Sequence, residues 1–296
     1  PFAASSSDIA NGDCTNDASN TLVGGKYCCK FGNTAVSNYF GRFIPDHLTV
    51  APITFVEPCT GFTYMDQPMT LTATIEGRNL ANNRTYNYSN AYGKAIITTE
   101  IENANNGTPI GSGRLSTAAA SWNGGQYLFS ASAFVKATNP DGPYDQLTIG
   151  LAASDADGVK MFDRDMQSNS TTCTPDTIGT SNGNCTAKTI ASTKMRQGRI
   201  KLSNAYGSEK LALPVPIKIE YWGGTNVGWT PNTLDASCTF PVASNYASSF
   251  SFAFPTGTTA KPNALAACET AISVNPLRLS APGVGNAGFT DITLNL

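Results

Sequence analysis

Short stretches of alternating apolar and polar residues recur between positions 41 and 165 of the chain. Alternation with a period of two predicts β-strands with one buried face, because successive side chains of a strand point to opposite sides. Turn sequences such as NNG, NGG and NPDG separate the stretches. The expected strands lie at residues 69–75, 95–101, 126–135 and 146–151. This spacing predicts a first β-sandwich over residues 41–165.

A second group of alternating stretches follows a polar segment at residues 166–193, which is rich in Thr, Asn and Ser. That segment offers few apolar residues to a core, so we place the domain boundary at its start. The later strands are expected at residues 199–202, 211–222, 249–254, 277–280 and 291–296. They predict a second β-sandwich over residues 166–296.

The first forty residues follow neither the helical nor the strand period. They are rich in Ser, Asn, Gly and Ala and contain three cysteines. We predict that residues 1–40 form an irregular segment pinned by disulfides. The chain as a whole is therefore expected to be all-β, with two immunoglobulin-like β-sandwich domains behind this segment.

Composition narrows the classes of function. Charged residues make up only 14% of the chain, well below the usual quarter, and the net charge is −2. A nucleic-acid binder needs clustered Lys and Arg, which the chain lacks, so nucleic acid is not an expected partner. No apolar run is long enough to cross a bilayer, so we expect no membrane insertion. The chain begins at Pro1 and not at Met, so we expect either that a signal peptide has been removed or that this is a piece of a longer chain.

Eight cysteines, an even number, predict a disulfide framework and an oxidising compartment. They are Cys14, Cys28, Cys29, Cys59, Cys173, Cys185, Cys238 and Cys268. Spacing favours Cys173–Cys185 around a polar loop and Cys238–Cys268 around the next variable stretch, with the first four cysteines pairing among themselves. A zinc site is less favoured, because structural zinc prefers C-x-x-C pairs or several histidines.

Aromatic residues beside glycine-rich turns are candidates for ligand contacts. Tyr221, Trp222 and Trp229 flank the tip at residues 223–228, where Asn226 could supply hydrogen bonds, and Trp122 precedes another Gly-Gly turn. An exposed ring with neighbouring amides is typical of sugar-binding sites, and a protein partner is the other ligand that such rings could contact. The alternative is that these rings simply pack on the sandwich.

Four aspartates form the densest acidic cluster of the chain. They are Asp155, Asp157, Asp163 and Asp165. An EF-hand is excluded, because Met166 stands where that loop requires Glu. A different Ca²⁺ loop is one hypothesis, and a solvated turn is the other. No other cofactor is expected.

Catalytic chemistry has little support. His47 is the only histidine and follows Asp46, but no nucleophile motif accompanies this pair. The carboxylates are scattered, and nothing marks the pair that glycoside hydrolysis requires. We therefore predict that the protein is not an enzyme and that His47 is a hydrogen-bonded residue at the start of the first strand.

Five segments together resemble a known family. They are residues 41–48 (GRFIPDHL), 62–68 (FTYMDQP), 198–208 (GRIKLSNAYGS), 213–222 (LPVPIKIEYW) and 277–286 (LRLSAPGVGN). In this order they resemble the large uncharacterised domain of MshQ-like proteins, which are associated with biogenesis of the mannose-sensitive haemagglutinin (type IV) pilus of Gram-negative bacteria. The resemblance runs from about residue 40 to the end, and it implies no catalytic residues.

The resemblance implies an exported, pilus-associated protein whose chain continues past Leu296. We therefore predict a non-catalytic structural or adhesive module, secreted or on the cell surface, at the tip or surface of a type IV pilus. Its expected partners are pilus subunits or another surface protein. The alternative is a carbohydrate-binding module that recognises a host or surface glycan through its Trp-bearing loop tips.

Overall fold

The three-dimensional structure is a computed structural model. It describes residues 44–103, 107–170, 172–235, 238, 250–253, 265–266, 278–279, 281, 284–285 and 291–294. Contacts divide the chain after Ile44, and the strands and sheets described below belong to the second unit, Pro45–Leu296. The predicted irregular segment at residues 1–40, with Cys14, Cys28 and Cys29, lies outside the described residues.

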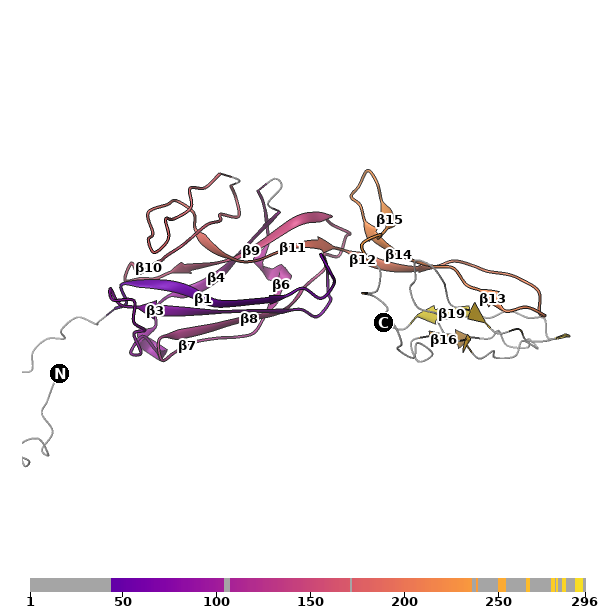
Figure 1. Ribbon diagram of the computed structural model, residues 1–296, viewed down its shortest axis with the longest axis horizontal. Coiled ribbons are helices and arrows are strands. Elements are labelled where there is room, and N and C mark those ends of the chain that lie inside the picture. The colour runs from indigo at the N-terminus through magenta and orange to yellow at the C-terminus, as the bar shows by residue number, and fades with distance from the viewer. Residues whose placement is uncertain are drawn as a thin grey trace, which may run out of the picture. The chain divides into compact units, whose positions relative to one another are not determined.

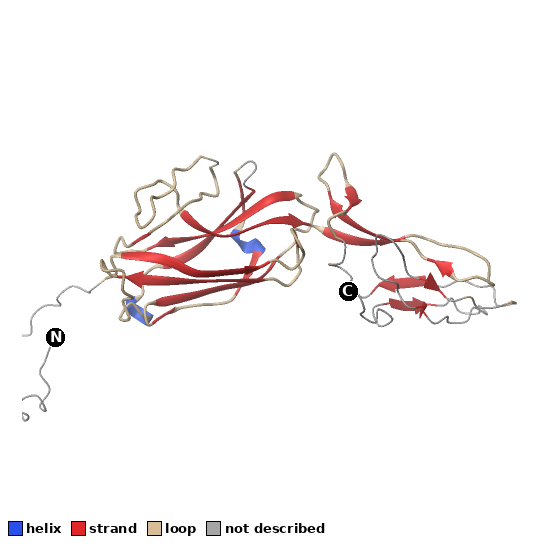
Figure 2. Cartoon of the chain, viewed as in Figure 1, coloured by secondary structure: helices blue, strands red, loops and turns tan. Residues whose placement is uncertain are grey.

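The regular structure of the described residues is almost entirely β-strand, which confirms the predicted all-β class (Figure 2). The described helices are two single 3₁₀ turns, η1 (Asn90–Tyr92) and η2 (Ser112–Arg114). Among the residues that the structure describes, no helix has the length and apolar character that a membrane crossing requires.

The first large sheet has six strands in the order β10-β1-β3-β8-β6, with β7 also paired to β8. Their bounds are β1 (His47–Val56), β3 (Thr70–Arg78), β6 (Leu115–Thr117), β7 (Trp122–Asn123), β8 (Gln126–Phe134) and β10 (Lys160–Met161). All pairs are antiparallel except β1 with β10.

The second large sheet has five strands in the order β2-β11-β9-β4-β5. Their bounds are β2 (Thr63–Tyr64), β4 (Ile96–Asn103), β5 (Thr108–Ile110), β9 (Tyr144–Ser154) and β11 (Ala187–Arg196). The chain changes sheet several times between neighbouring strands, so each sheet is assembled from distant segments.

The two sheets form two layers (Figure 1), and one hydrophobic core takes side chains from both of them. Leu71, Ile75 and Phe129 enter it from the first sheet, and Ile149 and Met195 enter it from the second. Burial of each such side chain contributes about 1.5–3 kcal/mol. The two layers therefore form a β-sandwich-like unit, while its immunoglobulin-like detail stays a prediction.

Strand β11 corrects the predicted boundary at residue 165. It pairs with β9 through Ala191 opposite Ile149 and Met195 opposite Tyr144, and it buries Ile190 in the sandwich core. The sandwich therefore extends to Arg196. The polar segment before β11 is a loop of this sandwich and not a linker between two domains.

Residues after Gln197 form smaller sheets. One has the order β12-β14-β15, one has the order β13-β18-β17, and β16 pairs with β19. Their bounds are β12 (Gly198–Leu202), β13 (Leu213–Pro214), β14 (Ile217–Trp222), β15 (Trp229–Pro231), β16 (Phe250–Ala253), β17 (Leu265–Ala266), β18 (Arg278–Leu279) and β19 (Asp291–Leu294). Much of the predicted second sandwich lies outside the described residues.

Candidate functional site

A disulfide joins two segments that are far apart in the sequence. Cys59, in the loop between β1 and β2, is bonded to Cys238, which follows β15; the sequence separation is 179 residues and the Cα atoms lie 5.3 Å apart. The predicted Cys238–Cys268 pair is therefore wrong, and so is the pairing of Cys59 within the first sixty residues. Cys268 lies outside the described residues.

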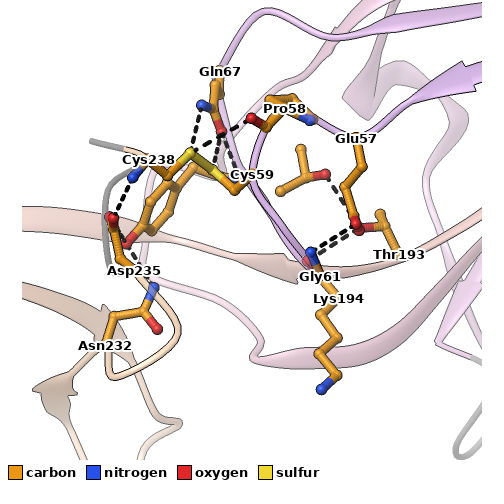
Figure 3. Close-up of a disulfide and its surroundings, with 12 residues drawn as sticks. Glu57, Pro58, Cys59, Gly61, Gln67, Thr193, Lys194, Asn232, Asp235 and Cys238 are labelled. Carbon is orange, nitrogen blue, oxygen red and sulfur yellow. Dashed lines mark hydrogen bonds between the residues drawn. A yellow bond between two sulfur atoms is a disulfide. The ribbon is translucent and has the colours of Figure 1, made fainter. Parts of the chain in front are cut away.

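Hydrogen bonds to Glu57 hold the loop that carries Cys59. One carboxylate oxygen accepts a bond from the Gly61 amide at 2.9 Å, and the other accepts one from the Thr193 hydroxyl at 2.6 Å (Figure 3). The hydroxyls of Thr63 and Thr193 also lie 3.1 Å apart. Strand β11 thus positions the loop and turns Cys59 toward Cys238.

A small polar network surrounds the disulfide on the other side. The Tyr64 hydroxyl donates to the Asp235 carboxylate at 2.9 Å and accepts a bond from the Asn232 amide at 2.6 Å. The second Asp235 oxygen accepts the backbone N–H of Cys238 at 2.9 Å (Figure 3). Asn232 and Asp235 are 7% and 6% exposed, so these polar groups are buried with their partners in place.

A single residue, Gln197, links β11 to β12, and contacts fix both Gln197 and the preceding residue, Arg196. The Gln197 side-chain oxygen accepts the Asp141 N–H at 3.0 Å, and its backbone carbonyl accepts the Trp222 N–H at 2.9 Å. The buried Arg196 guanidinium donates to the Tyr144 carbonyl and lies over the Tyr221 ring, 5.0 Å from its centroid. We call the Cys59–Cys238 disulfide, the Tyr64 network and the Gln197 link the disulfide junction.

The predicted Cys173–Cys185 disulfide is present, with a sequence separation of 12 residues. It staples a loop whose polar groups bond to one another. Arg164 donates to both oxygens of Asp176, at 2.9 and 3.0 Å, and the Asp176 side chain is fully buried. Burial acts to raise the pKa of Asp176, but hydrogen bonds from Arg164 and Gly183, with the Arg164 charge, outweigh it and lower the pKa.

Trp122 is not an exposed ligand contact, contrary to one of our two hypotheses. It is 4% exposed, its ring packs edge-on against Tyr88 at 4.8 Å, and its Nε1 donates to the Ala95 carbonyl at 2.8 Å. The alternative, a ring packed on the sandwich, is what the structure has. The Gly-Gly turn beside it suggested exposure, but β7 pairs with β8 and points the indole inward.

The other four predicted ligand residues lie on one hairpin formed by β14 and β15. Trp222 and Trp229 stand opposite each other with ring centroids 5.7 Å apart, and the Arg199 guanidinium lies 4.2 Å from the Trp229 centroid. Tyr221 is half-buried beneath Arg196, and Asn226 is exposed at the tip. The two half-buried indoles contact each other, and Arg199 covers part of the Trp229 ring.

Three of the four aspartate carboxylates of the predicted calcium loop are engaged in separate contacts. Asp155 accepts a bond from the Tyr88 hydroxyl and another from the Asp157 N–H, Asp163 accepts the Gly179 N–H, and Asp165 pairs with Lys188. No three His, Cys, Asp or Glu residues in the described part of the chain form a group that could hold a metal. The structure therefore does not bring these carboxylates together as a Ca²⁺ site.

His47 occupies the structural position expected of it, at the start of β1. It is 5% exposed, its Nδ1 lies 2.9 Å from an Asp46 oxygen, and its ring stacks on Phe162 with centroids 4.0 Å apart. Burial of the ring removes it from contact with a substrate in solution.

Comparison with protein-family models identifies two consecutive domains. Residues 26–180 match the third domain of DUF6701, and residues 196–296 match its fourth domain. The chain belongs to the DUF6701 family. A search of curated proteins found no match to it.

The disulfide junction therefore connects the third and fourth DUF6701 domains. Cys59 and Tyr64 belong to the third domain, while Cys238, Asn232 and Asp235 belong to the fourth. The sequence did not predict the polar network of Tyr64, Asn232 and Asp235, because polar residues separated by some 170 positions carry no local signal. Only the odd position of Cys59, far from the other early cysteines, hinted at a long-range bond.

Proposed function

We propose that these two DUF6701 domains form a non-catalytic structural and adhesive module of an extracellular, pilus-associated protein. The observation that carries the proposal is the disulfide junction, which adds a second covalent connection to the one-residue link between the domains. Two connections and a buried polar network restrict the motion of one domain against the other. A module that presents a binding surface, or that transmits force at a cell surface, needs such a rigid connection between its domains.

The disulfides also support the location. Disulfides persist in oxidising compartments, and each stabilises a fold by roughly 2–4 kcal/mol, largely by restricting the unfolded chain. The charge-poor composition adds to this picture, since the side chain of Thr suits exposed strand faces. A type IV pilus, with its subunits or another surface protein as partner, follows from the MshQ-like resemblance and is part of the proposal.

The state of the polar side chains supports a non-catalytic role. His47 is stacked and buried, and two buried carboxylates have structural partners: Glu220 pairs with Arg199, and Asp176 pairs with Arg164. A general acid or base must reach a substrate, and these groups face protein.

The proposal is tested in cells that produce the full-length protein. Antibodies against the chain should label intact cells at their surface or along pili in immunogold micrographs. The double variant Cys59→Ser/Cys238→Ser should still be exported but should support less cell attachment than the wild type. The matched control, Cys173→Ser/Cys185→Ser, removes a disulfide within one domain and should reduce attachment less. Labelling only after permeabilisation, or equal attachment by all three proteins, contradicts the proposal.

A further inference from the structure

Residues 79–93 of the third DUF6701 domain form a loop of consecutive hydrogen-bonded turns. The N–H groups of Asn82, Tyr88 and Tyr92 donate to carbonyls three residues earlier, at 2.8, 3.0 and 2.9 Å. Each turn reverses the chain within four residues. The loop therefore has a defined backbone, and a ligand that binds it need not pay the entropy of ordering a flexible segment.

Buried aromatic residues fix this turn loop to the sandwich. Tyr88 is 2% exposed and lies against Trp122, and its hydroxyl accepts the Ala95 N–H at 2.7 Å and donates to Asp155. Gly93 passes so close to the Trp122 side chain that a Cβ at Gly93 would lie 2.5 Å from the Trp122 Cγ. The buried Trp122 side chain thus packs against two positions of the loop, Tyr88 and Gly93.

The turn loop carries exposed rings and amides. Tyr86 is 65% exposed and Tyr92 is 64% exposed, and Asn87 and Asn90 at the turn corners are exposed as well. The Arg84 guanidinium lies over the Tyr86 ring, 4.2 Å from its centroid, and holds that ring in place.

The composition of the turn loop limits the kinds of ligand that it can bind. Residues 77–99 contain five asparagines and no Asp or Glu. Leu80 is the loop's only large aliphatic side chain, so most of the exposed apolar surface of the loop comes from the two tyrosine rings. Amides beside rigid rings match a ligand that presents both hydroxyl groups and apolar C–H faces.

We infer that the turn loop is a glycan-binding site, with Tyr86 and Tyr92 as stacking platforms and Asn87 and Asn90 as hydrogen-bonding partners of sugar hydroxyls. The turn geometry places the Cα atoms of the two tyrosines at most about 18 Å apart, within the span of a short oligosaccharide. This inference deepens the adhesive part of the proposed function and rests on it. The inferred glycan site is the turn loop at residues 79–93, and not the Trp-bearing loop tips for which the sequence predicted it.

The inference is tested with the full chain on an array of neutral and acidic oligosaccharides, followed by titration of the glycans that bind. The variant Tyr86→Ala/Tyr92→Ala should lose at least tenfold in affinity, whereas Tyr86→Phe/Tyr92→Phe, which keeps both rings, should lose less than threefold. Tyr206→Ala is the matched control, since Tyr206 is 96% exposed in the fourth domain, and it should bind like the wild type. Circular dichroism should show that every variant is folded.

Two results overturn the inference. One is that the folded wild-type chain binds no glycan on the array. The other is glycan binding that survives Tyr86→Ala/Tyr92→Ala but disappears with Trp222→Ala. Surface labelling of cells is a separate measurement, so a silent array with normal surface display removes the glycan site and leaves the structural module in place.

Discussion

Gly93 shows how a single missing side chain shapes the third domain. Its φ is −80°, which any residue can adopt, so backbone freedom does not explain the glycine. The reason is steric: the Cβ of an alanine at Gly93 would lie 2.5 Å from the Cγ atom of Trp122 and closer still to its Cβ. The indole occupies the space that a side chain would need.

Gly93→Ala should therefore destabilise the chain by about 1–3 kcal/mol, the usual cost of forcing extra volume into a packed site. Gly111→Ala is the control, because Gly111 has a φ of −56° and a Cβ added there would meet no heavy atom within 4 Å. Urea unfolding measures both changes. Equal stability of the two variants would show that Trp122 does not pack against Gly93.

Asp176 gives the third domain a pH-dependent element. Its pKa is lowered in the folded chain, so the carboxylate stabilises the fold fully above its unfolded pKa of about 3.9, and this contribution is lost as the pH falls through the lower, folded pKa. Neutral and weakly acidic conditions leave the Arg164–Asp176 pair intact.

Asp176→Asn should reduce the free energy of unfolding at pH 7 by up to about 3 kcal/mol, because it leaves the Arg164 guanidinium without its bidentate partner. The gap between the two proteins should narrow as the pH falls below about 4, where the carboxylate of the unfolded wild-type chain begins to bind a proton, and it should close once the pH is below the lower pKa of the folded chain. Urea unfolding at a series of pH values measures this gap. A difference that stays constant down to pH 2 would mean that the carboxylate charge is not the stabilising feature.

At the level of elements, the pattern of alternation predicted most strands of the third domain, because their inward residues are large. The expected stretches at 69–75, 95–101, 126–135 and 146–151 overlap β3, β4, β8 and β9. The alternation did not predict strand β11. Its buried positions include Ala187 and Ala191, whose small side chains give little hydrophobic signal in a segment rich in Thr, Ser and Lys. A strand buried through small residues has little hydrophobic signal.

The place of β11 leads to a prediction about domain boundaries. A fragment of residues 45–165 lacks β11, one of the two strands that pair with β9, and exposes the core at Leu147 and Ile149, so it should not fold cooperatively. A fragment of residues 45–197 restores β11 and should unfold in one cooperative transition, with Cys59→Ser in both fragments to remove the free thiol. Thermal circular dichroism distinguishes them. Cooperative unfolding of the shorter fragment would restore the boundary that the sequence suggested.

At the scale of the whole molecule, cysteine spacing predicted the local disulfide and failed for the distant one. Cys173 and Cys185 flank one loop, so proximity along the chain and proximity in space agree. Cys59 and Cys238 meet only because β2 pairs with the end of β11, and β11 continues after one residue into the next domain. Such a meeting depends on the complete topology, which local patterns do not contain.

The same topology makes the disulfide junction a mechanical limit on the module. Under tension between residues 45 and 296, the Cys59–Cys238 bond carries the force, and the 179 positions that it spans stay out of the load path. Most of the third domain is thereby protected from extension, even if its sheets loosen. This property suits a component of a filament or cell surface that experiences shear.

Single-molecule pulling on residues 45 and 296 measures this limit. Cys59→Ser/Cys238→Ser should lengthen the fully unfolded chain by about 600 Å relative to the wild type, given about 3.4 Å per extended residue. The control Cys173→Ser/Cys185→Ser should add only about 40 Å in a chain that also lacks the long bond. If Cys238 were bonded to Cys268 instead, Cys238→Ser alone would release about 100 Å and Cys59→Ser would release none. Equal extensions for Cys59→Ser and Cys238→Ser, each near about 600 Å, are expected because either substitution breaks the same bond.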